Sequence, residues 1–124
     1  MFFSKYKNER CIDRGDVDAV DFDVNDFTAD ATWRDLDLSG IVGARVARAV
    51  FRCDILTEVG KGTIALKQKG ITNDINIGFR EALASGYPIY ADITVLTNSA
   101  GIIQYKLSDL AHTFINLTVK RYFV

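Results

Sequence analysis

Residues 88–97, Pro-Ile-Tyr-Ala-Asp-Ile-Thr-Val-Leu-Thr, decide how this chain folds. Side chains of an extended strand point alternately to its two faces, so Ile89, Ala91, Ile93 and Val95 share one face. An apolar period of two, rich in β-branched residues, is typical of a strand with one buried face. We therefore predict a strand over residues 88–97.

The same alternation recurs along most of the chain, from about residue 17 to its end. Gly, Asn, Asp and Ser residues separate the alternating runs and form the turns. The further predicted strands, with the apolar residues of one face in parentheses, are 17–28 (Val20, Phe22, Val24), 33–38 (Leu36, Leu38), 63–69 (Ile64, Leu66), 75–80 (Ile75, Ile77, Phe79), 102–107 (Ile103, Tyr105, Leu107) and 114–124 (Ile115, Leu117, Val119, Phe123).

Residues 45–57 fit two patterns. The three arginines of this stretch fall on one face of a helix, whereas Phe51, Cys53 and Ile55 alternate as they would in a strand. Because the neighbouring segments are strands and the apolar residues include aromatic and β-branched types, we favour a strand. A helix remains the alternative.

About eight strands without strong intervening helices indicate an antiparallel, all-β sandwich. Eight is the strand number of a jelly roll, which we therefore predict, with a closed barrel or an immunoglobulin-like sandwich as alternatives. A chain of 124 residues is the usual size of one domain, which we assign to residues 13–124. Residues 1–12 lack the alternation, and we interpret them as an N-terminal arm.

Composition and charge exclude several classes of protein. Hydrophobic residues make up 48% of the chain and charged residues 25%, which argues against a disordered chain or a coiled coil. A net charge of −1 without a dense basic patch argues against nucleic-acid binding. The chain shows no secretion signal and no apolar run of membrane-spanning length. We expect a soluble, unexported protein in which Cys11 and Cys53 are free thiols.

An acidic stretch at residues 13–26 suggests calcium, which prefers carboxylate oxygens. An EF-hand loop that began at Asp21 would need glycine at its sixth position and glutamate at its twelfth, but Asp26 and Thr32 stand there. We interpret the stretch as the solvated face of a strand and predict no metal site.

No arrangement typical of an enzyme stands out. His112 is the only histidine and lacks ligand-like spacing to Cys11 or Cys53, so we interpret it as a loop residue and the cysteines as inert, buried thiols. Asp35 and Asp37 form a carboxylate pair, but such pairs on an outward strand face are usually solubilising. We predict neither catalysis nor a cofactor.

Exposed aromatic residues are the remaining candidates for a site. Trp33, Tyr87 and Tyr90 have the amphipathic rings that stack on sugars or fill subunit interfaces. A plainer interpretation places Trp33 and Tyr105 in the core, whereas Tyr87, beside Pro88, is expected to be exposed.

Several short motifs together resemble small, uncharacterised proteins found in phage-derived and environmental sequences. The resemblance covers about residues 12–123, although Gly43-Ala44-Arg45 stands where that pattern tends to have a Pro-Ala-Gly type of turn. It implies a virion-associated β-sandwich and no established activity. The motifs are Asp13-Arg14-Gly15-Asp16, Trp33 with Asp35-Leu36-Asp37-Leu38-Ser39 and Ile41-Val42, Asn73-Asp74-Ile75-Asn76, Gly101-Ile102-Ile103-Gln104-Tyr105 and Leu117-Thr118-Val119.

Two functional hypotheses follow. In the first, the chain is a non-enzymatic structural protein of a virion, a capsid decoration protein or tail-fibre module that assembles with copies of itself, as a trimer, and with other virion proteins. The acidic residues 1–40, with ten Asp/Glu against five Lys/Arg, and the more basic remainder fit such packing between subunits. In the second, it is a carbohydrate-binding module in which Trp33, Tyr87 or Tyr90 stack on sugars.

Overall fold

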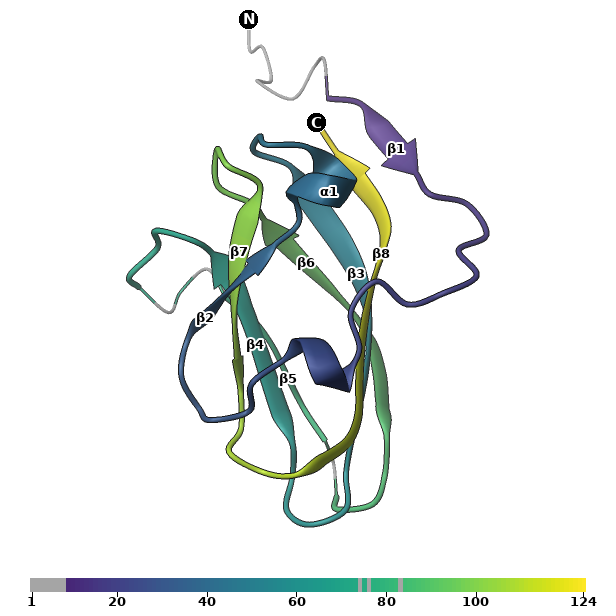
Figure 1. Cartoon of the computed structure of the whole chain (residues 1–124), viewed down its shortest axis with the longest axis vertical. Coiled ribbons are helices and arrows are strands. Elements are labelled where there is room, and N and C mark those ends of the chain that lie inside the picture. Colours follow the sequence, from purple (N-terminus) through teal and green to yellow (C-terminus); the bar gives the residue numbers. More distant parts are fainter. Residues whose placement is uncertain (1–8, 74, 76, 83) are drawn as a thin grey trace, which may run out of the picture.

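In a computed structural model of the chain, two four-stranded sheets pack face to face as a β-sandwich (Figure 1). The structure describes residues 9–73, 75, 77–82 and 84–124, and no helix among them is long and apolar enough to cross a membrane. The elements are β1 (Cys11–Asp13), η1 (Val24–Asp26), β2 (Arg34–Asp37), α1 (Ser39–Val42), β3 (Arg48–Thr57), β4 (Thr63–Gln68), β5 (Ile77–Glu81), β6 (Ile89–Leu96), β7 (Ile102–Leu107) and β8 (His112–Phe123).

Each sheet combines strands from both halves of the chain. Sheet A has the order β1-β8-β3-β6 and sheet B the order β2-β7-β4-β5, and all neighbours are antiparallel. The pairs β1–β8, β2–β7, β3–β6 and β4–β5 are those of one long hairpin wound around a core, which is the jelly-roll arrangement. The predicted fold class is confirmed.

The core lies between the sheets and is built from alternate residues of the strands. In β3, Ala49, Phe51, Cys53 and Ile55 are fully buried, which confirms the strand interpretation of residues 45–57. The apolar faces predicted for the strands that became β2, β4 and β7 are buried as well. Each large side chain among them, such as Phe51 or Ile55, stabilises the fold by roughly 1.5–3 kcal/mol when it is fully buried.

Strand β8 follows the predicted alternation only as far as Val119. The next buried residue is Tyr122, and the prediction that Phe123 points inward is wrong. The pairing of β8 with β3 skips Lys120, so one extra residue bulges out of the ladder. Because side chains alternate with a period of two, a one-residue bulge exchanges the two faces beyond it.

The predicted strand at residues 17–28 is wrong. This stretch makes one isolated bridge, between Phe22 and Leu117, and then turns through the 3-10 helix η1. Val20, predicted to point inward, is 44% exposed. Aspartates that accept hydrogen bonds from nearby backbone amides favour turns over strands, and this stretch is rich in them.

The eighth strand is instead β1, at the end of the predicted arm. Cys11–Asp13 pairs with the end of β8, and Arg10 exchanges two backbone hydrogen bonds with Val124. The predicted arm, residues 1–12, thus overlaps β1, because Cys11 and Ile12 belong to sheet A. Residues 1–8 lie outside the described residues.

Strand β5 is shorter than predicted and presents its apolar residues outward. Ile75 precedes the strand and is 87% exposed, and Phe79 is 48% exposed on the outer face. The inward position between the outward residues is Gly78, where a Cβ atom would overlap the side chain of Ile93. The prediction of a strand is right here, but its apolar face does not join the core.

Candidate interaction groove

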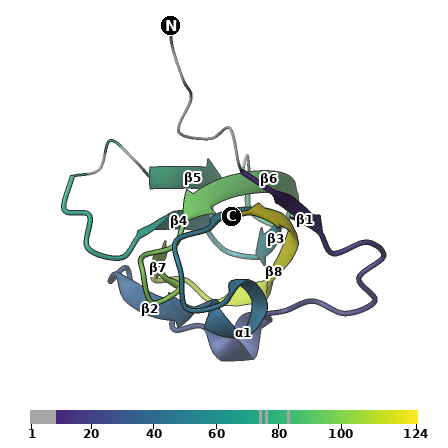
Figure 2. The ribbon, with the colours of Figure 1, turned by 90° about the horizontal axis from the view of Figure 1, so that it is seen from above.

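The sandwich has two sides at which an edge of sheet A meets an edge of sheet B. The closed side carries β1, β2 and residues 14–33, which join them. The open side carries β5 and β6. Seen from above, β5 and β6 lie beside each other on one side, and residues 14–33 run around the other (Figure 2).

On the closed side, residues that follow β1 form hydrogen bonds with the free backbone edge of β8. Phe22 exchanges two backbone hydrogen bonds with Leu117, at 2.9 and 3.0 Å. Nearer β1, the Asp21 carboxylate accepts the Val119 N–H at 2.8 Å, while the Arg14 guanidinium donates to the Val119 carbonyl at 3.0 Å and to Asp21. A largely buried ion pair thus takes the place of a paired strand.

These contacts also account for the acidic stretch that suggested calcium. The Asp23 carboxylate accepts the Asn25 N–H and the Asp26 carboxylate accepts the Asp23 N–H, both at 2.9 Å, which caps η1. Interpreting the stretch as a strand face was wrong. Among the residues that the structure describes, no three His, Cys, Asp or Glu side chains gather as a metal site would require.

Residues 14–33 also contact sheet B, at strand β7. The Ala31 N–H donates to the Leu107 carbonyl at 2.8 Å, and the Thr28 N–H donates to the Tyr105 hydroxyl at 3.0 Å. The Phe27 ring meets the Tyr105 ring edge-on, with centroids 5.0 Å apart. Tyr105 is buried, which confirms that it belongs to the core.

On the open side, alternate residues of β6 direct their backbone groups away from the sheet. The Thr97 N–H donates to the Ala47 carbonyl at 2.9 Å, so the odd-numbered residues are those bonded to β3. The even-numbered residues of β6 point their N–H and C=O groups toward the open side, and their side chains are exposed on the outer face of sheet A: Tyr90, Asp92, Thr94 and Leu96.

One side chain bridges the two edges of the open side. The Arg80 guanidinium donates to the Asp92 carbonyl of β6 at 2.8 Å and to the Phe79 carbonyl of β5 at 2.7 Å. No backbone hydrogen bond joins β5 to β6 in the described part of the chain. The jelly roll is therefore open along this seam.

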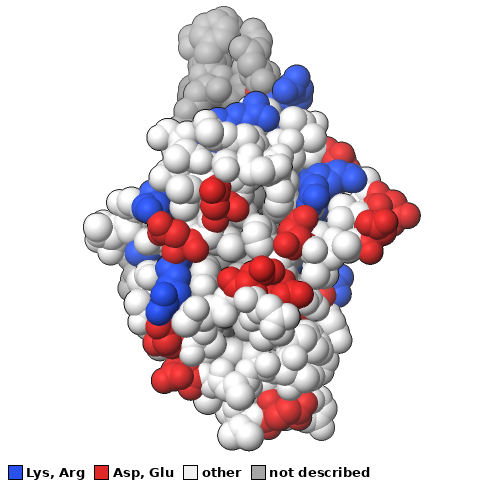
Figure 3. Space-filling view, in the orientation of Figure 1, with Lys and Arg blue, Asp and Glu red and all other residues white. Residues whose placement is uncertain are grey.

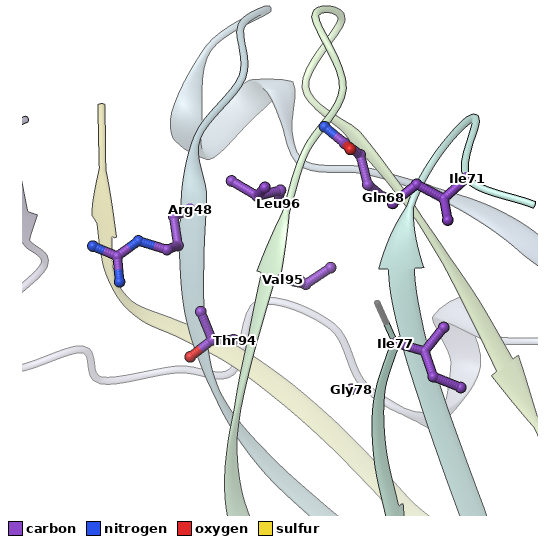
Figure 4. Close-up of a pocket in the computed structure, with 8 residues that line it drawn as sticks. All are labelled: Arg48, Gln68, Ile71, Ile77, Gly78, Thr94, Val95 and Leu96. Carbon is purple, nitrogen blue, oxygen red and sulfur yellow. The ribbon is translucent and has the colours of Figure 1, made fainter. Parts of the chain in front are cut away.

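A groove with a volume of about 380 Å³ opens along the seam. Apolar side chains of both edges and of the β4–β5 connection form most of its lining, and Figure 4 shows the Arg48 guanidinium turned away from it toward β8. The lining residues are Arg48, Gln68, Ile71, Ile77, Gly78, Thr94, Val95 and Leu96. Its apolar lining and flanking free edges suit a segment of protein chain.

The three aromatic residues predicted to form a ligand or interface site do not converge. Trp33 is half-buried on the outer face of sheet B, with the Lys67 ammonium 4.3 Å from its ring centroid, and is not part of the core. Tyr90 lies on the outer face of sheet A beneath the Arg52 guanidinium, and Tyr87 is exposed in the β5–β6 connection. Only Tyr90 belongs to the open edge.

Neither the histidine nor the two cysteines line the groove. His112 begins β8, so its placement in a loop was wrong; Nε2 donates to the Ser108 carbonyl at 3.1 Å, and burial lowers its pKa. Both thiols are free, as predicted. Burial raises the pKa of Cys53 to about 12, whereas Cys11 is exposed, contrary to the expectation of a buried thiol.

The carboxylate pair Asp35 and Asp37 lacks the asymmetry of an acid–base pair. Hydrogen bonding to Lys69 and Gln104 lowers the pKa of Asp35, and the backbone N–H of Ser39 lowers the pKa of Asp37. Both groups are therefore ionised at neutral pH. A general acid needs a carboxyl whose pKa is raised.

Neither the described residues on the face shown in Figure 3 nor the comparisons add a second candidate site. Acidic and basic side chains are interspersed over the face shown in Figure 3. No family model, curated protein or solved structure matches the chain. The resemblance to small phage-associated proteins stays a prediction.

The composition of residues 89–96 could have indicated an open edge, but the sequence analysis used only their alternation of apolar and polar residues. Residues 89–96 hold no Lys or Pro, and their outward positions include Tyr90 and Leu96 beside Asp92 and Thr94. Charged side chains, lysine above all, proline and bulges are the usual protection of an edge strand, and Asp92 is the one charged residue of this stretch. The periodicity identifies the strand, but which strands become edges depends on the winding of the hairpin.

Proposed function

We propose that this protein is a non-enzymatic structural module that acts by self-association through the open side of its jelly roll. The observation that carries the proposal is the edge of β6. β6 has eight residues and pairs with β3 without a register shift. Apart from the Asp92 carbonyl, which accepts from Arg80, an edge of this length presents a row of donors and acceptors to another chain.

The other three edge strands, β1, β2 and β5, offer a second chain fewer backbone groups to pair with. β1 and β2 have three and four residues, and the closed side covers the strands behind them. β5 has five residues, of which Arg80 and Glu81 are charged. The exposed Tyr90 and Leu96 side chains of β6, 58% and 43% accessible, lie beside the groove and add apolar area to the same edge.

The proposal extends the structural role that the sequence resemblance implies, in a capsid decoration protein or a tail-fibre module of a virion. Glycan binding is the alternative function, and Tyr87 and Tyr90 are the exposed aromatic residues that favour it. In that case ligand binding, not association, would depend on the two tyrosines.

Light scattering over a series of protein concentrations tests the proposal. We expect a mass above the 13.8 kDa of one chain that rises with concentration. A variant that lacks residues 1–8 keeps β1 in place and separates the contribution of the arm from that of the open side. A mass of one chain at all concentrations would overturn the proposal, and glycan binding that requires Tyr90 would then favour the alternative.

A further inference from the structure

Only the even-numbered residues of β6 direct their backbone groups toward the open side, and this restricts how a second copy of the chain can pair with β6. Hydrogen-bonded partners in an antiparallel ladder are residues whose backbone groups face each other, so the even-numbered residues of one β6 must oppose the even-numbered residues of the other. Successive registers of this kind differ by two residues. The possible contacts between two β6 edges are therefore few.

Three registers bring the middle of one strand against the middle of the other. In the first, Asp92 opposes Asp92 of the second copy, which places two carboxylates directly across the ladder, each paired with Lys120 of its own chain at 2.9 Å. In the second, Thr94 opposes Thr94 of the second copy and Tyr90 loses its partner within β6. In the third, Asp92 opposes Thr94 of the second copy and Tyr90 opposes Leu96 of the second copy.

Only the third register pairs all four outward residues of β6. It places an aromatic ring against a leucine at both ends of the contact and keeps the two aspartates apart. Aromatic and apolar cross-strand pairs each stabilise a ladder by roughly 0.2–1 kcal/mol. The edge is thus complementary to itself in one register.

We infer that two copies of the chain associate by antiparallel pairing of their β6 strands, with Asp92 facing Thr94 of the second copy. A two-fold axis then passes beside Ile93, and sheet A continues across the contact as an eight-stranded sheet. About eight backbone hydrogen bonds form, since each hydrogen-bonded pair exchanges two. The contact is closed and isologous, so it makes a dimer and not the trimer that the sequence suggested.

Arg80 is the contact that this pairing displaces. Its guanidinium occupies the Asp92 carbonyl, one of the acceptors that the second copy needs. The bond lies at the surface, so water or the Phe79 carbonyl keeps the guanidinium solvated when it leaves. The inference rests on the proposed function, because it assigns an interface and a register to the self-association proposed there.

Opposite charges at position 94 test the register. Thr94 is exposed, and its replacement changes the outer face without touching the core. Thr94→Asp places a carboxylate opposite Asp92 of the second copy at two symmetric positions, and we expect a dissociation constant about tenfold higher. Thr94→Lys places an ammonium there, and we expect the constant to fall about threefold. Sedimentation equilibrium at low salt measures both, since salt screens exposed charges.

Thr118→Asp and Thr118→Lys are the matched controls. Thr118 lies on β8 in the same sheet, two strands from the open edge, and we expect both variants to associate like the parent chain. Circular dichroism and thermal unfolding verify that each variant folds. If Thr94→Asp fails to fold, the opposite effect expected of Thr94→Lys still tests the register.

The outcomes separate this inference from the proposed function. A dimer that both Thr94 variants leave unchanged, or shift in the same direction, would place the interface elsewhere while self-association stands. A trimer would overturn the two-fold contact. A parent chain that stays monomeric at all concentrations would contradict the self-association itself.

Discussion

On the closed side, the chain supplies its own partners for the edge of β8: β1, Phe22 and the Arg14–Asp21 pair. On the open side, the edge of β6 receives one guanidinium along its eight residues. Both edges belong to the same sheet. The difference shows how a jelly roll completes one seam with its longest connection and leaves the opposite seam open.

The two sides also differ in what their contacts do for stability. Contacts of the closed side join segments about a hundred residues apart in sequence and exclude water from the core. The polar contacts of the open side, made by Arg80, lie at the surface. Substitutions on the closed side should therefore act on the free energy of unfolding, and substitutions on the open side on association.

The largest expected effect comes from replacing a phenylalanine by alanine, once on the closed side and once on the open side. Phe27→Ala removes a ring that packs on Tyr105 and the core, and we expect it to lower the free energy of unfolding by about 2 kcal/mol. Phe79→Ala removes a half-exposed ring and should cost less than about 0.5 kcal/mol. Urea unfolding measures both. Equal losses of the free energy of unfolding in the two variants would contradict the proposed difference between the closed and the open side.

Polar contacts provide a second, smaller test. Asp21→Ala leaves the Val119 N–H and the Arg14 guanidinium without their partner, and we expect a loss of about 1–2 kcal/mol in urea unfolding. Arg80→Ala should change stability by less than about 0.5 kcal/mol and tighten association, because it frees the Asp92 carbonyl. Weaker association of Arg80→Ala would show that the guanidinium is part of the interface.

The smallest expected effect is a dependence of the free energy of unfolding on pH, which we assign to His112. Burial lowers the pKa of His112, and its Nδ1 atom is buried without a hydrogen-bond partner. The unfolded chain therefore binds the proton more readily than the folded chain does. Stability from this group is complete above about pH 6.5 and falls as the pH drops toward the pKa of the folded state.

Thermal unfolding at pH 7.5 and pH 5.5 measures this effect. We expect a lower Tm at pH 5.5 and a smaller difference in His112→Gln, which does not titrate. Aspartates with lowered pKa values, such as Asp35 and Asp37, titrate below this window and do not contribute. An unchanged difference in the variant would assign the pH dependence to another group.

The strands were predictable from sequence wherever one face is buried and regular. β3, β6 and β7 follow a period of two because the opposite sheet covers one face throughout. The prediction failed where backbone geometry changes without a change in hydrophobicity. The bulge at Lys120 and the capped turn at η1 are such places, since both occur within alternating sequence.

The candidate site was less predictable than the fold. Tyr90 was a candidate for its exposed ring, but its importance here comes from the free backbone of β6, which no side-chain pattern encodes. The pairing of strands distant in sequence decides which edge stays free. Trp33 and Tyr87 lie on other surfaces for the same reason, although the sequence made all three residues candidates for a ligand or interface site.

Amide hydrogen exchange of β6, measured by NMR at low and high protein concentration, tests the central claim most directly. Odd-numbered amides are bonded to β3 and should be protected at both concentrations. If β6 pairs with β6, the amides of Asp92 and Thr94 become protected only at high concentration, while Val119 on the closed side does not change. Exchange at Asp92 and Thr94 that is equally fast at both concentrations, in a sample that light scattering shows to be associated, would contradict the account.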